Sequence, residues 1–204
     1  MEEKTINVQT KGIENDKKNY KINEFENFDT LANYYIGKTE GVLTKIIING
    51  KEIPLSFYDE IKNAYFEGGE DILLEISSKE FVLIDLTEQS LNYILKIKEN
   101  MEKFSKEVLL KSTEGYKMLN AIAEGIQSLL SILEQVSVFT SKTLYTDDDI
   151  KKISKVINAI VESQKSSDSI ELSDIIDYDL PEIVDNMHTM FEEAERLLKN
   201  KKSN

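Results

Sequence analysis

The first part of the chain alternates apolar and polar residues in short runs. Residues 5–12 (TINVQTKG) and 20–25 (YKINEF) follow this period of two, and the polar segment IENDKKN lies between them. Two such runs joined by a turn are typical of a β-hairpin. A segment with apolar positions at helical spacing follows, and we expect a short helix capped by Asp29 or Thr30.

Residues 43–77 carry the most informative pattern, LTKIIINGKEIPLSFYDEIKNAYFEGGEDILLEIS. Asn49-Gly50 is a favoured pair for a tight type I′ hairpin turn, because both residues tolerate positive φ. Pro54 is expected to end the short returning strand. A one- or two-turn helical segment over 56–65, a turn at Gly68-Gly69 and a strand buried at the centre of a sheet (DILLEIS) complete the prediction.

The order hairpin, helix, strand with an Asn-Gly return, short helical crossover and final strand resembles the ubiquitin-like β-grasp fold over about residues 4–78. The residues that carry this resemblance are IIINGKEI, SFYDEI and ILLEI. Family members that are conjugated, or that carry sulfur, end in an exposed Gly-Gly tail. Here Gly68-Gly69 is internal and the chain ends Lys-Lys-Ser-Asn, so we expect a docking domain rather than a modifier or sulfur carrier.

The second part of the chain shows the spacing of amphipathic helices over residues 91–108, 116–136, 150–161 and 170–199. Ser112 is the expected N-cap of the second helix, and glycines at 115 and 125 indicate close packing or bending there. Phe81 to Ile84 fits either a strand or the start of a helix, with Asp85 or Thr87 as a possible cap.

Three further features predict where these helices begin and end. Asp147 to Asp149 complement the dipole at a helix start, and they lack the alternating ligands, glycine and final glutamate of a calcium-binding EF-hand loop. Residues 164–169 (QKSSDS) are expected to form a loop. Pro181 should break or kink the last segment into a short helix over 171–178 and a longer helix from 181.

The sequence therefore predicts an α+β protein. Residues 1–80 form a small β-grasp-like, ubiquitin-like domain, and residues 81–204 form an antiparallel helical bundle.

Composition narrows the possible partners. The net charge is −13, and arginine occurs once beside 24 lysines. An acidic field repels phosphate backbones and anionic lipid surfaces, so we expect neither nucleic-acid nor membrane binding. The sequence contains no cysteine, which excludes disulfides and thiolate chemistry, and its first residues lack a secretory signal pattern. We therefore predict a cytoplasmic protein.

Two short motifs could carry chemistry. Gly37-Lys38-Thr39 resembles the end of a phosphate-binding loop, but Ala32 stands where that loop needs its first glycine. His188, the only histidine, shares a helix face with Asp185 and Glu192, three residues before it and four after it. These three residues are weak candidates for a single metal site, and a solvated helix face is the alternative.

We predict no catalytic residues and no cofactor. The function that this pattern favours is a non-enzymatic interaction, adaptor or assembly protein, resembling a chaperone, whose partner is another protein. One alternative is an enzyme that binds a small molecule or a metal in the bundle near His188. Another is a structural homodimer formed through the long helices.

Overall fold

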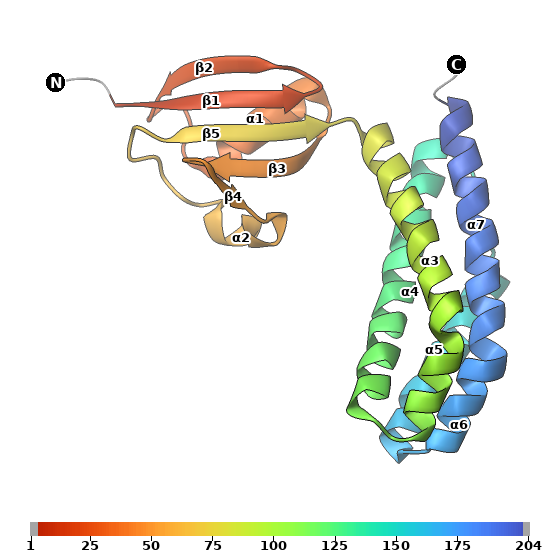
Figure 1. Ribbon diagram of the computed structural model, residues 1–204. Coiled ribbons are helices and arrows are strands. Elements are labelled where there is room, and N and C mark those ends of the chain that lie inside the picture. Colours follow the sequence, from red (N-terminus) through yellow and green to blue (C-terminus); the bar gives the residue numbers. More distant parts are fainter. Residues whose placement is uncertain (1–3, 202–204) are drawn as a thin grey trace. The chain divides into compact units, whose positions relative to one another are not determined.

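The computed structural model describes residues 4–201, and the chain divides into two compact units between Val82 and Leu83. The first unit is built on a mixed five-stranded sheet, and the second consists of helices (Figure 1). The protein is therefore of the α+β class, as the sequence predicts. The predicted division after residue 80 lies two residues before the division in the structure.

The sheet has the strand order β2-β1-β5-β3-β4. Its strands are β1 (Thr5–Gly12), β2 (Asp16–Lys21), β3 (Val42–Ile48), β4 (Lys51–Ile53) and β5 (Asp71–Ser77). Strand β5 pairs in parallel with β1 and antiparallel with β3, so it is central, as the apolar run DILLEIS predicts. The element order predicted for this unit is the order observed.

One face of the sheet is apolar because the strands alternate. In register, Val8 lies beside Ile72, and Ile46 lies beside Leu74. Helix α1 (Phe28–Thr39) packs its buried residues against the same core. Each such fully buried side chain contributes about 1.5–3 kcal/mol to stability, so this face holds the first unit together. Its fully or nearly fully buried apolar residues are Ile6, Val8, Phe28, Leu31, Ala32, Tyr35, Ile46, Ile72, Leu74 and Ile76.

The predicted turns of this unit are confirmed. Asn49 and Gly50 both have positive φ, 51° and 77°, as a type I′ turn requires. The side chain of Asn49 also accepts a 2.9 Å hydrogen bond from the backbone N–H of Asp71, which ties this turn to β5. Gly68 and Gly69 form the second turn with φ of 97° and 94°.

Three local predictions in this unit are wrong. Strand β2 begins at Asp16 rather than at residue 20, because an edge strand needs no second apolar face and accepts the polar residues DKKN. Helix α1 is capped by Asn27, whose side chain accepts from Thr30 N while Thr30 closes a capping box. The crossover is shorter than residues 56–65: a 3₁₀ turn, η1 (Leu55–Phe57), leads into one α-helical turn, α2 (Tyr58–Ile61).

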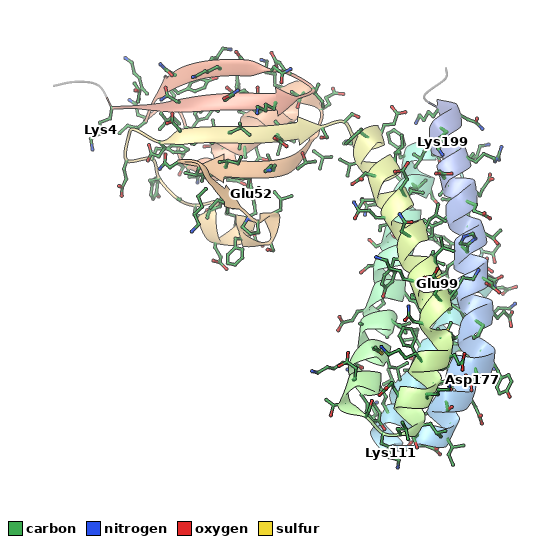
Figure 2. The ribbon with its side chains drawn as sticks, in the orientation of Figure 1. Lys4, Glu52, Glu99, Lys111, Asp177 and Lys199 are labelled. Carbon is green, nitrogen blue, oxygen red and sulfur yellow. The ribbon has the colours of Figure 1, made fainter. Side chains whose placement is uncertain are left out.

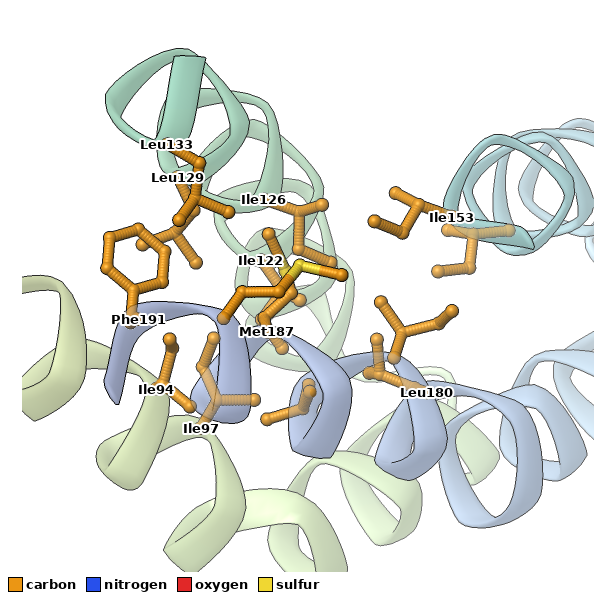
Figure 3. Packing of buried hydrophobic residues seen from close by; sticks show 14 of the residues in the cluster. Ile94, Ile97, Ile122, Ile126, Leu129, Leu133, Ile153, Leu180, Met187 and Phe191 are labelled. Atoms are coloured by element: carbon orange, nitrogen blue, oxygen red, sulfur yellow. The ribbon is translucent and has the colours of Figure 1, made fainter. Parts of the chain in front are cut away.

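The second unit consists of four long helical segments, each antiparallel to the one before it (Figure 1). These are α3 (Lys79–Leu109), α4 (Thr113–Thr140), α5 (Asp147–Ser166) and a run of α6 (Ser169–Asp174), the π turn η2 (Ile175–Asp179) and α7 (Leu180–Lys201). Apolar side chains of α3, α4, α5 and α7 meet inside it, including Ile97, Ile126 and Met187 (Figure 3). The antiparallel bundle is therefore observed.

Helix starts in this unit follow local capping. Ser112 caps α4 by accepting from Gly115 N, as predicted, and Thr146 caps α5 in a capping box with Asp149. Phe81 to Ile84 belongs to α3, which begins at Lys79, so a cap at Asp85 or Thr87 is wrong. The hydroxyl of Ser78 accepts from Phe81 N and replaces that cap.

The connection from α5 to α6 is shorter than the predicted loop over 164–169. Helix α5 continues to Ser166, and Asp168 already caps α6 by accepting from the N–H groups of Ile170 and Glu171. The predicted short helix and longer helix are observed as α6, which ends at Asp174, and α7, which begins at Leu180, but the π turn η2 joins them without a break before Pro181. The wide turn η2 precedes it and gives the proline ring room beside the carbonyl four residues earlier, so the helical run continues through Pro181.

Candidate functional site

The candidate site is a groove between α3 and α4, and a glycine shapes it. Gly125 lies on α4 opposite Tyr93 of α3, and a Cβ atom at position 125 would lie 2.6 Å from Cε1 of Tyr93. The missing side chain allows the tyrosine ring to lie against α4. The close packing that the sequence predicts at Gly125 is confirmed.

The Tyr93 hydroxyl is held in place by one hydrogen bond. Its Oη donates to the carbonyl oxygen of Ala121 over 3.0 Å. Burial raises the pKa of Tyr93, and the nearby Glu124 carboxylate raises that pKa further. The tyrosine therefore stays neutral and keeps its proton as a donor near neutral pH.

The groove beside this tyrosine has a volume of about 450 Å³. Apolar side chains of both helices contribute to it, among them Leu86 of α3 and Leu129 and Ile132 of α4. The polar residues Gln89 and Ser128 are exposed at its edge. An open apolar floor with a few polar groups at its rim suits an apolar helix or peptide better than a charged small molecule.

The candidate metal residues are not brought together. Asp185 Oδ1 pairs with Nζ of Lys98 at 2.6 Å, and His188 Nδ1 lies 3.6 Å from Glu192 Oε2. Residues 4–201 contain no group of three histidine or carboxylate side chains that could hold a metal ion. The side chains of Asp185, His188 and Glu192 therefore form pairwise surface contacts in this structure.

Gly37-Lys38-Thr39 lies at the wrong end of a helix for phosphate binding. It forms the C-terminal turn of α1, where the helix dipole is negative, whereas a phosphate-binding loop precedes a helix. Lys38 pairs with Glu14 at 2.7 Å, and the Thr39 hydroxyl donates to the carbonyl of Tyr35. Each polar side chain of the motif thus has a structural role.

The tyrosines of the first unit divide between core and surface. Tyr35 is buried and its hydroxyl lies 2.9 Å from that of Tyr20, while Tyr58 donates to Asp29 Oδ1 at 2.8 Å. Tyr34 is 45% exposed and Tyr65 is 76% exposed. The four residues Tyr34, Tyr35, Tyr58 and Tyr65 therefore do not form one aromatic surface, and packing explains the buried ones.

The fold and the groove define an α+β protein whose helical bundle carries an open apolar recess. The chain belongs to the family described as "Domain of unknown function (DUF8042)", which matches residues 85–201 and so spans nearly all of the bundle. No curated protein and no solved structure matches the chain significantly. None of the helices within residues 4–201 combines the length and the apolar character needed to cross a membrane.

Proposed function

We propose that this protein is a non-enzymatic interaction protein of the cytoplasm, an adaptor or assembly factor whose bundle holds an apolar helix of a partner in the α3–α4 groove. The observation that carries this proposal is the Tyr93–Gly125 contact, which leaves an apolar recess between two long helices. Helices that dock in such grooves insert residues at i, i+3, i+4 and i+7.

Tyr93 supplies a suitable centre for this groove. Tyrosine is enriched at the positions that dominate binding energy, because it offers a large rigid ring and one polar group. The hydrogen bond to Ala121 fixes the ring before a partner arrives, so little conformational entropy is lost on binding.

The first unit has the role of a second docking surface in this proposal. The order β2-β1-β5-β3-β4 and the helix packed across one face support a β-grasp domain, the fold that the sequence resembles. This domain would present its sheet to proteins rather than become conjugated to them, because Gly68-Gly69 is a turn inside the unit.

A pull-down with a groove-blocking variant tests the proposal. Ser128→Trp fills the groove from its rim, and Ser131→Trp places the same bulk at an exposed serine of α4 outside the groove. We expect wild type and Ser131→Trp to retain the same partner at physiological salt and Ser128→Trp to lose it. A chain that remains a strict monomer and retains no partner would contradict the proposal, as would a partner that Ser128→Trp still retains.

A further inference from the structure

The π turn η2 creates a second feature, away from the groove. Asp177, Tyr178 and Asp179 are all exposed, and the Tyr178 side chain is 75% exposed. In this turn the buried Ile175 and Ile176 are followed by the three exposed residues, and the helical run returns to the core at Leu180. The turn thus projects an aromatic ring between two carboxylates.

Contacts with α3 hold the π turn in this shape. The Ser105 hydroxyl donates to Asp177 Oδ2 over 2.9 Å and lies 2.8 Å from the Ser173 hydroxyl. Ser105 and Ser173 are buried, so this hydrogen-bonded cluster spans the two helices inside the bundle. A turn fixed in this way presents Tyr178 in a defined position before any partner binds.

The sequence around Tyr178 is acidic, and lysines of neighbouring helices reach this run at Ser167 and Glu182, where Lys111 and Lys152 make contacts. Ten carboxylates and no lysine or arginine lie between Lys165 and Arg196. Within residues 4–201, the side chains of Glu171, Asp174 and Asp179 form no ion pair. Ile170, Asp174 and Tyr178 are four residues apart and lie on successive turns of one helical run, and Ile170 is 67% exposed.

The exposed carboxylates and apolar side chains between Ile170 and Asp179 are spread along the helical run and do not converge on one point. From Ile170 to Asp179 the run rises by roughly 13 Å at the α-helical value of about 1.5 Å per residue. Charges spread over that length complement several cationic side chains of one extended or helical segment, and the two exposed apolar residues add apolar contact area. Figure 2 shows Asp177 toward the same end of the bundle as Lys111, with Lys199 near the other end.

We propose that Glu171, Asp174 and Asp179, together with Ile170 and Tyr178, form a docking edge for a basic amphipathic segment of another protein. Lysine or arginine side chains pair with the three carboxylates, and apolar residues of the segment pack on Ile170 and Tyr178. This edge is separate from the α3–α4 groove. Its carboxylates predict a basic partner segment, whereas the apolar groove predicts no charge for its partner.

A fluorescent peptide of about 18 residues, with leucines at helical spacing among lysines, is a direct probe for the edge. Binding to the full chain is measured by anisotropy at low and at physiological salt. The triple variant Glu171→Gln/Asp174→Asn/Asp179→Asn should weaken binding roughly tenfold at low salt, because it removes three exposed ion pairs with the peptide. Tyr178→Ser should weaken it several-fold.

Two matched controls separate the edge from general acidity. Glu88→Gln/Glu99→Gln/Glu134→Gln removes the same charge from exposed positions elsewhere on the bundle, and Tyr65→Ser removes an equally exposed tyrosine from the first unit. We expect both controls to bind like wild type. The proposal would be overturned if a control lost as much affinity for the peptide as its matched variant, or if folded wild type did not bind the peptide. Circular dichroism verifies that each variant is folded.

Discussion

Tyr93 of α3 lies over Gly125 of α4, where the position of a Cβ atom would be only 2.6 Å from Cε1 of the tyrosine. This relationship predicts a coupling between the two residues. Gly125→Ala should destabilise the bundle by about 1 kcal/mol, because overpacking costs about 1–3 kcal/mol and the gain in helix propensity returns up to about 1 kcal/mol. In a Tyr93→Ala background the same change should stabilise it. Urea unfolding of the four chains measures this cycle, and an equal effect of Gly125→Ala in both backgrounds would refute the coupling.

The Ser105 hydrogen bonds predict a second effect on stability. Ser105→Ala leaves the buried Ser173 hydroxyl without this partner and releases Asp177, so the free energy of unfolding should fall by about 1–3 kcal/mol. Ser128→Ala is the control, because its exposed hydroxyl bonds only to the carbonyl of Glu124 in the same helix. Denaturation followed by helical circular dichroism should show the larger loss for Ser105→Ala. Equal small losses would mean that this cluster does not stabilise the bundle.

Two glycines of the first unit should respond very differently to alanine. Gly50 has φ of 77°, and a Cβ atom there would meet nothing within 4 Å, so Gly50→Ala should cost about 1 kcal/mol of backbone strain alone. Gly12 has φ of 106°, and a Cβ atom there would overlap the backbone carbonyl of Ile76. Gly12→Ala should therefore destabilise the sheet by more than about 3 kcal/mol. Thermal unfolding compares the stability of the two variants. Similar losses of stability would contradict the close approach between residue 12 and the Ile76 carbonyl.

The tyrosines of the first unit predict a loss of stability at high pH. Burial, and then the hydrogen bond to Asp29, raises the pKa of Tyr58, and burial likewise raises that of Tyr35. The unfolded chain releases these protons above about pH 10, while the folded chain retains them. The contribution of these two tyrosines to the free energy of unfolding is therefore complete below about pH 10. It is lost as the pH rises further, by up to about 1.4 kcal/mol per pH unit for each tyrosine.

A single substitution isolates this pH dependence. Tyr58→Phe should make the fall in unfolding free energy between about pH 10 and 11.5 shallower by close to one proton. Denaturant titrations across that range provide the measurement. An unchanged slope for Tyr58→Phe would mean that its proton is released equally in both states.

Most of the fold could be predicted from local patterns. Strand alternation, the Asn49-Gly50 turn and the helical spacing after residue 91 each reflect one dominant local preference. The errors lie where tertiary context decides. An edge position allows β2 to be polar, and an apolar run such as Phe81 to Ile84 fits a strand and a helix equally well until its neighbours are known.

Less of the candidate site than of the fold could be predicted from the sequence. Gly125 indicated close packing, but its partner Tyr93 lies 32 residues earlier and no local pattern connects the two. The π turn is not predicted for a related reason: Pro181 indicates a disrupted helix, while the contact between the buried Ser105 and Ser173 hydroxyls beside the wide turn joins residues 68 positions apart. Spacing did place Asp185, His188 and Glu192 on one face, yet Lys98 of another helix pairs with Asp185.

Site-specific crosslinking tests the central claim, that the α3–α4 groove receives a partner, most directly. Because the sequence contains no cysteine, Ser128→Cys and Ser131→Cys each carry a single attachment point for a photoreactive label. After illumination in a lysate of the native cell, the label at residue 128 should yield one discrete adduct through an apolar helical segment of the partner, and the label at residue 131 should not. Adducts of equal yield from both positions, or none from residue 128, would contradict the account.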